Sequence, residues 1–335
     1  MARLQRISSI GHNCLDAKES SQWYAATLGF EAHDVEQFSG IWLEELLGVP
    51  AAALERHRMQ LGQETLEIWQ FDHDNPVGFG SEENSISHVP AGNDSAFQHI
   101  CIVTSDLGKA LSHGAEKAKQ ISSSPQRLPD WNPGAGGIRA VKFADPDGHP
   151  LELLQFPVGK GDGRWHQLAA LNKVEATRQH KNNLFLGLDH TAISVAETEQ
   201  SLHFYSTILG MELVGQGHNY GPEQDAMDGL LGTDVLISSL HGSEGGMGIE
   251  LLQYRKPEGG IRPRPNPRAN DRDEWHICAV VDNLTTLYQQ LQREPLAQNL
   301  GPLVSMPERF GSGEIACQLR DPDGHALLLF GAKDH

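Results

Sequence analysis

The pattern of apolar and polar positions divides the chain into four similar parts. Four short apolar segments each start close to a histidine, and these are His12, His99, His190 and His276. The intervals are nearly equal, because 99 − 12 = 87, 190 − 99 = 91 and 276 − 190 = 86. Each segment is typical of a strand, and a helical pattern and then about three more strand-like segments follow it. The repetition predicts four modules of the same construction.

The four modules are of two alternating kinds. The odd modules share an aromatic pair before Leu-Gly, at 23–29 and at 204–210, where the glycine is a helix stop signal. The even modules share Asp-Pro-Asp-Gly-His, at 145–149 and at 321–325, which suits a type I turn that closes a hairpin. The simplest account is a two-module unit that was duplicated.

Composition shifts indicate where the modules are joined. Segments rich in Pro, Gly, Asn and Ser occur at 72–95 and 255–274, and a Gly/Lys-rich stretch with a predicted helix over 167–178 joins the two halves. We therefore expect an α+β protein with two domains of two modules each. The expected domains are residues 1–156 (modules about 8–72 and 96–156) and 187–335 (modules about 187–255 and 274–332), with 157–186 as linker.

Charge and composition exclude several classes of function. The formal net charge of −18 argues against binding to nucleic acid or to an anionic membrane. We find no apolar run of transmembrane length and no signal peptide, and the four cysteines are scattered without a CxxC. We expect a cytoplasmic protein with reduced thiols.

The last strand of three modules carries a glutamate within apolar residues. These are Glu67, Glu152 and Glu250, while Leu328 takes the corresponding place in the fourth module. A histidine in a first strand and a glutamate in a last strand lie side by side if the strands pair. Two imidazoles and two carboxylates suit one divalent cation, either Zn, Ni, Mn or Fe(II). We predict a first metal site of His12, Glu67, His99 and Glu152, and a weaker second site of His190, Glu250 and His276.

How the modules pair decides which residues share a site. We prefer sequential pairing, 1 with 2 and 3 with 4, because the duplicated unit has two modules. If modules 1 and 4 pair instead, and 2 with 3, the full set becomes His99, Glu152, His190 and Glu250. Any one of these histidines taken alone is more typical of packing or of a surface, and the hypothesis depends on their recurrence. We interpret His149 and His325 as turn residues rather than ligands.

The repeat, the aromatic pair, the Asp-Pro-Asp-Gly-His hairpin and the His/Glu placement together resemble the vicinal oxygen chelate superfamily. Its members include glyoxalase I, extradiol dioxygenases and bleomycin resistance proteins. The resemblance covers about residues 8–156 and 187–332. It implies βαβββ modules that pair into barrel-like cups around a metal, with a small-molecule substrate and no nucleotide cofactor. The four-ligand pattern looks like glyoxalase I, which implies an isomerase or lyase in which Glu152 or Glu67 is the base.

Two other functions stay open at this stage. An extradiol ring-cleaving dioxygenase would use Fe(II) at His190, His276 and Glu250, although Leu328 stands where that family usually has its glutamate. A binding or drug-resistance protein would use the same cups without catalysis. No residues suggest a glutathione site, and a homodimer is an open option for the assembly.

Overall fold

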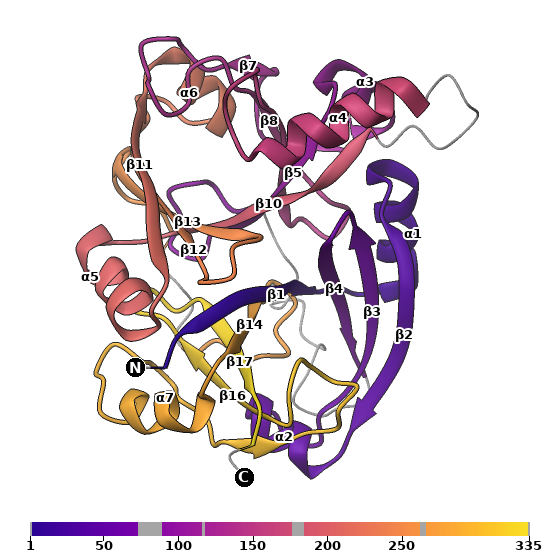
Figure 1. Ribbon diagram of the computed structural model, residues 1–335, viewed down its shortest axis with the longest axis vertical. Coiled ribbons are helices and arrows are strands. Elements are labelled where there is room, and N and C mark those ends of the chain that lie inside the picture. Colours follow the sequence, from indigo (N-terminus) through magenta and orange to yellow (C-terminus); the bar gives the residue numbers. More distant parts are fainter. Residues whose placement is uncertain (1, 73–88, 116–117, 176–183, 262–265, 334–335) are drawn as a thin grey trace.

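A computed structural model describes residues 2–72, 89–115, 118–175, 184–261 and 266–333. In these residues the strands form two sheets, of eight and nine strands (Figure 1). Sheet A runs in the order β15 (Val304–Ser305), β16 (Ile315–Arg320), β17 (Ala326–Gly331), β14 (Trp275–Val281), β1 (Leu4–Asn13), β4 (Glu64–Phe71), β3 (Ala53–Leu61) and β2 (Glu31–Ser39). Sheet B runs in the order β11 (Glu212–Tyr220), β12 (Asp234–His241), β13 (Gly248–Lys256), β10 (Phe185–Ser194), β5 (Gln98–Thr104), β9 (Pro150–Gln155), β8 (Arg139–Ala144) and β6 (Lys119–Gln120), and β7 (Gln126–Arg127) pairs with β8.

The sheet order corrects the predicted pairing of modules. Antiparallel β1 and β14 join modules 1 and 4 in sheet A, and antiparallel β5 and β10 join modules 2 and 3 in sheet B (Figure 1). Sequential pairing is therefore wrong, and the alternative pairing is the one observed. The reason is that the first strand of either even module is an equally apolar partner for the first strand of an odd module. The hydrophobic pattern consequently does not encode which of them pairs.

The helices begin and end where the local signals predict. Asp16 caps α1 (Ala17–Leu28) by accepting a hydrogen bond from the Glu19 amide, and Gly29 ends it in the left-handed region at φ 71°. In module 3, Glu197 precedes α5 (Thr198–Leu202) without a side-chain cap, and Gly210 at φ 76° follows the π-helical segment η3 (His203–Ile208). The others are α2 (Ile41–Leu47), α3 (Leu107–Ser112), α4 (Gly163–Glu175), α6 (Pro222–Asp228) and α7 (Leu284–Leu291). α4 confirms the helix expected in the linker as far as Glu175, and 176–178 lie outside the described residues. Among the described residues, each helix is too short or too polar to cross a bilayer.

The two faces of each sheet have different roles. One face of both sheets, together with α1, α3 and α7, forms a single large core that includes Ile10, Ile100 and Ile193. The other face of each sheet curls into a cup. In sheet A the two ends of the cup meet, since the rings of Phe38 and Phe310 are 5.0 Å apart. In sheet B, α6 closes the cup, because the Ala226 carbonyl accepts hydrogen bonds from the Ser123 amide and hydroxyl.

The two Asp-Pro-Asp-Gly-His turns fasten the sheets to each other. Tyr24 on α1 donates to Asp145 at 2.9 Å, and Tyr205 on η3 donates to Asp321 at 3.0 Å. In each turn the aspartate also accepts from the amide of the histidine four residues on, so that the carboxylate is fixed. Module 1 is therefore held to module 2, and module 3 to module 4, by helix-to-hairpin contacts, although the strands of each pair belong to different sheets.

Candidate metal centre

Four donor residues from four adjacent strands converge in the cup of sheet B. In the register, Ala192 of β10 lies between His99 and Glu250, and Cys101 of β5 lies between His190 and Glu152. Since side chains alternate along a strand, all four donors point to the same face. Their neighbours Ile100, Thr191 and Leu151 point to the opposite face.

Donor atoms of three of these residues lie close enough to share one cation, and Glu250 approaches one of the three. His99 Nε2 is 3.0 Å from Glu152 Oε2, and His190 Nε2 is 4.0 Å from the same oxygen. Glu250 Oε2 is 3.4 Å from His190 Nε2. Ligand atoms of His99, Glu152 and His190 all lie within 4.8 Å of one another, and the three residues are buried.

The surroundings of the donors fit a metal centre. Asp189 accepts a hydrogen bond from His190 Nδ1 at 2.9 Å and another from Trp165 at 2.8 Å, which turns His190 Nε2 toward the carboxylates. A carboxylate in this position typically orients a metal-bound imidazole. His190 Nε2 and His99 Nδ1 are buried without a hydrogen-bond partner. The unbonded Nε2 of His190 faces the carboxylates of Glu152 and Glu250, whereas His99 faces Glu152 with its hydrogen-bonded Nε2. Two buried imidazoles beside two carboxylates, one of them with an unbonded nitrogen in the cluster, are a donor set that a divalent cation would complete.

The charges in the cup of sheet B keep the Glu152 carboxylate ionised. Burial would raise the pKa of Glu152, but the hydrogen bond and charge of His99 and the charge of Lys142 lower it to about 2. Burial lowers the pKa of His99 to about 4, so this imidazole is neutral and able to bind a metal. Burial opposes protonation of His190 too, yet Glu250 and Asp189 raise its pKa to about 9. The carboxylates around His190 therefore make positive charge favourable at this place in the cup.

The predicted first-half set does not converge. Gly11, not His12, lies between Glu67 and His276 in the register of sheet A. His12 therefore points to the core face, where its Nε2 is 3.2 Å from the Tyr24 hydroxyl. It groups with Asp145 and with His149, whose ring centroid is 4.0 Å away. The predicted second-half set is divided too, since His276 lies in sheet A and His190 and Glu250 in sheet B.

The spacing of the aromatic pairs in the two odd modules indicates which residue is the counterpart of His190. The aromatic pairs are separated by 205 − 24 = 181 residues, whereas His12 and His190 are separated by 190 − 12 = 178. The position equivalent to His190 is therefore Ser9, and the register agrees, because Ser9 pairs with Cys278 as His190 pairs with Cys101. His12 corresponds to Ile193, a core residue.

The cup of sheet A has lost the features of a metal site. Its counterparts of the four donors are Ser9, Glu67, His276 and Leu328. Glu67 is already satisfied by Ser9 at 2.9 Å, by the Trp69 indole at 3.0 Å and by Arg56 at 3.4 Å.

Two further features of this cup oppose a cation. The guanidinium of Arg56 is buried beside Glu67, and burial together with this charge lowers the pKa of His276 to about 3. Aromatic and aliphatic side chains, among them Trp69, Phe310 and Leu328, fill the remaining space. Although Glu67, His276 and Cys278 lie within reach of one another, the cup of sheet B is the better candidate.

The donors in sheet B are reachable from one side. The Glu250 side chain is 23% exposed, whereas that of His99 is 2% exposed. On the edge strand β11, which is separated from β13 by β12, a Cβ added at Gly215 or Gly217 would meet no atom within 4 Å. The register of sheet A has Asp34 and Glu36 at the equivalent places, and Glu36 pairs with Arg56 there. The glycines leave open space where sheet A has these acidic side chains.

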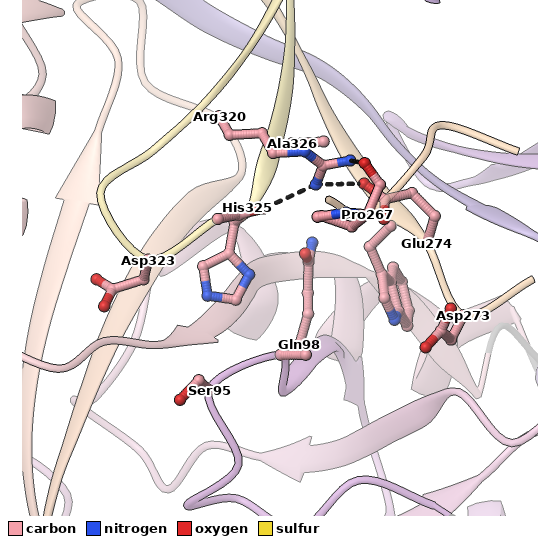
Figure 2. A pocket seen from close by; sticks show the side chains of 12 residues that line it. Ser95, Gln98, Pro267, Asp273, Glu274, Arg320, Asp323, His325 and Ala326 are labelled. Carbon is pink, nitrogen blue, oxygen red and sulfur yellow. Dashed lines mark hydrogen bonds and ion pairs between the residues drawn. The ribbon is translucent and has the colours of Figure 1, made fainter. Parts of the chain in front are cut away.

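A separate small pocket lies where the start of β5 meets the turn at 321–325, and Figure 2 shows its lining. Arg320 pairs there with Glu274 at 2.6 Å, and His325 Nε2 donates to the Ser194 carbonyl at 2.8 Å. Burial raises the pKa of Glu274 to about 7 although Arg320 opposes the shift. The volume of this pocket, about 60 Å³, is far below that of a typical small-molecule site, and none of the four metal donors lines the pocket. We therefore place the functional site in the cup of sheet B.

Comparisons with known proteins agree with this architecture. A profile of the glyoxalase/bleomycin resistance protein/dioxygenase superfamily matches residues 6–153 and 187–329. Glyoxalase I of Saccharomyces cerevisiae is 22% identical over 267 residues, which cover 74% of this chain and 69% of the yeast protein. A 2-epi-5-epi-valiolone epimerase of Actinomyces is 25% identical over 158 residues, covering 46% of this chain and 80% of the epimerase.

Solved structures show the same fold. A glyoxalase I variant from Zea mays superposes with a TM-score of 0.60 at 14% identity and covers 97% of this chain and 92% of its own. A putative dioxygenase from Bacillus subtilis superposes with a TM-score of 0.56 at 13% identity, covering 99% of this chain and 86% of its own. The profile matches most of the sequence, and the sheets have the paired-module order of this fold. The chain therefore belongs to the glyoxalase/bleomycin resistance protein/dioxygenase superfamily.

Proposed function

We propose that the chain is a divalent-metal-dependent enzyme of the glyoxalase I kind. It would act as an isomerase or lyase on a small molecule with two adjacent oxygen atoms. The metal would be held by His99, Glu152, His190 and Glu250. The observation that carries the proposal is the convergence of His99, Glu152 and His190 within 4.8 Å on one face of sheet B, with Glu250 3.4 Å from His190 Nε2, which is buried and has no hydrogen-bond partner.

The four residues divide into fixed and mobile donors. His99 and Glu152 hold each other at 3.0 Å, and Asp189 holds His190, so these three have little freedom. Glu250 is the most exposed of the four and accepts one hydrogen bond, from Ser239 at 2.8 Å. Glu250 is thus the better candidate for the base than Glu152, which we expected from the sequence along with Glu67.

A cation at this place would polarise both substrate oxygens and stabilise negative charge that forms on them. Glu250 would take a proton from the carbon next to the polarised oxygen and return it to the neighbouring carbon. Asp189 would keep the His190 imidazole in the tautomer that leaves Nε2 unprotonated. The names of two relatives, a glyoxalase I and an epimerase, fit an isomerase-type reaction of this kind.

Hydrogen exchange at carbon tests the proposal without knowledge of the natural substrate. Protein loaded with Zn²⁺, Ni²⁺ or Mn²⁺ is incubated in D₂O with dihydroxyacetone, which has two adjacent oxygens, and deuterium uptake is measured by mass spectrometry. We expect metal-dependent uptake that Glu250→Gln slows by about 100-fold or more while the bound metal is retained. Glu212→Gln on the exposed edge strand is the matched control. Equal exchange in wild type and Glu250→Gln would contradict the assignment of the base.

The same cup is also the place for the second candidate, an Fe(II)-dependent ring-cleaving dioxygenase. His99, His190 and one carboxylate form a two-histidine, one-carboxylate set of the type that Fe(II) oxygenases use. Oxygen uptake with catechol after anaerobic iron loading would favour this candidate. We rank it second because Glu250 supplies a fourth protein donor and leaves fewer positions for substrate and oxygen. Tight binding of an aromatic compound that survives chelator treatment would favour a binding protein instead.

A further inference from the structure

A buried lysine lies beside the proposed metal centre. Lys142 of β8 is directly opposite Glu152 of β9 in the antiparallel register, so the two side chains share the cup face. Its neighbours Val141 and Phe143 belong to the core face, in agreement with the alternation of the strand. The Lys142 side chain is 5% exposed, and its positive charge contributes to the low pKa of Glu152.

The counter-ion of Lys142 comes from the helix that closes the cup and not from a strand of sheet B. Lys142 Nζ donates at 2.7 Å to Asp228, the last residue of the capping helix α6. Two other donors converge on the second oxygen of Asp228, namely the Tyr254 hydroxyl at 3.0 Å and the Gln224 amide at 2.8 Å. The Asp228 carboxylate is therefore bound by the Lys142 ammonium, the Tyr254 hydroxyl and the Gln224 amide. This carboxylate-binding position lies next to the metal donors, because Lys142 is opposite Glu152.

The cup of sheet A shows that the fold does not need this arrangement. The register places Gln318 where sheet B has Lys142, and α2 ends in Leu47 where α6 ends in Asp228. Phe71 stands in place of Tyr254, since it follows Glu67 by the same four residues as Tyr254 follows Glu250. Because a buried ion pair typically adds little stability compared with apolar residues of similar volume, a Lys142–Asp228 pair beside the metal donors, at positions that are Gln318 and Leu47 in sheet A, suggests a function.

We propose that Lys142 is a specificity-determining residue that binds a carboxylate of the substrate, and that Asp228 holds that position until the substrate displaces it. The inference deepens the proposed function and depends on it. It assigns the substrate class: a small molecule with two adjacent oxygens for the metal and, a few bonds away, a carboxylate group. We assign a carboxylate rather than a bulkier phosphate because the Asp228 carboxylate already occupies this carboxylate-binding position.

Two probes that differ in this group alone test the inference. Malate and 2-hydroxybutyrate share the same pair of adjacent oxygens, but malate has a distal carboxylate where 2-hydroxybutyrate has a methyl group. Binding of each to the Mn²⁺-loaded full-length protein is measured by titration calorimetry, after the bound Mn²⁺ has been counted. The test variant combines Lys142→Gln with Asp228→Leu, which copies the residues of sheet A and leaves no charge unpaired. Lys109→Gln, at a side chain that is 78% exposed, is the matched control.

We expect wild type and the control to bind malate about tenfold or more tightly than 2-hydroxybutyrate. The double variant should bind one Mn²⁺ as wild type does, melt cooperatively and lose the preference for malate. A preference that persists in the double variant, or that is absent from wild type with bound Mn²⁺, overturns the role of Lys142 and leaves the metal centre intact. A wild-type protein that binds no divalent metal overturns the proposed function and this inference together.

Discussion

The burial of His12 predicts a loss of stability in acid that one substitution should remove. Burial and the charge of His149 lower the pKa of His12 to about 3, while an unfolded chain has an ordinary histidine pKa of about 6.5. Between these values the unfolded chain binds more protons than the folded chain, so the stability falls as the pH falls. At about pH 5 the unfolded state gains roughly 2 kcal/mol from this single group compared with pH 7.5.

His12→Ile is the natural test, because Ile193 is the counterpart of His12 in the other odd module. Urea unfolding at pH 7.5 and pH 5 gives the free energy of unfolding at both values. The substitution also removes the contacts of His12 to Tyr24 and Trp275, but that change cancels in the difference between the two pH values.

We expect the variant to lose about 2 kcal/mol less than wild type between the two pH values. The same substitution at exposed His33 is the control. An unchanged pH dependence in His12→Ile would refute the assignment of a neutral, buried His12 to the core face of β1.

Three further predictions concern the turns, the filled cup and the orienting carboxylate. Tyr24→Phe and Tyr205→Phe each remove a buried hydrogen bond to a carboxylate. Each should lower the free energy of unfolding, measured with denaturant, by about 1.5–3 kcal/mol. A loss below about 0.5 kcal/mol in both variants would show that these turns do not hold the two sheets together. Leu328→Glu should not create a second metal site, because Arg56 stays in that cup, and metal counting should still give the wild-type stoichiometry. Asp189→Asn should weaken metal binding by about 10- to 100-fold in a chelator competition with little change in melting temperature, and an unchanged affinity would contradict its role in orienting His190.

The sequence predicted the parts of this fold that depend on local chemistry. The helix end at Gly29 and the hairpin turns at 145–149 and 321–325 lie where the residues indicate. The four βαβββ modules and the superfamily are confirmed as well. These features follow from side chains close together in the chain, so a single sequence contains the information. The cytoplasmic location and the homodimer stay predictions.

The grouping of the site residues depended on information that the pattern lacks. The choice between β14 and β5 as partner of β1 is made by long-range packing, and both strands are similarly apolar. A histidine near the start of each module was a misleading marker, since His12 faces the core and Ser9 faces the cup. The face of a strand changes with a shift of one residue, so an alignment error of three residues was enough to reverse it. Lys142 and Asp189 were missed because neither stands in a repeated motif.

The most direct test of the metal centre is an anomalous difference map from crystals of the full-length protein soaked in Mn²⁺ or Zn²⁺. The proposed function predicts one strong peak in the cup of sheet B, about 2.0–2.2 Å from imidazole nitrogens of His99 and His190 and from carboxylate oxygens of Glu152 and Glu250. A peak at Glu67, His276 and Cys278 instead, or at His12, Asp145 and His149, would contradict it. So would a map in which the cup of sheet B stays empty at saturating metal.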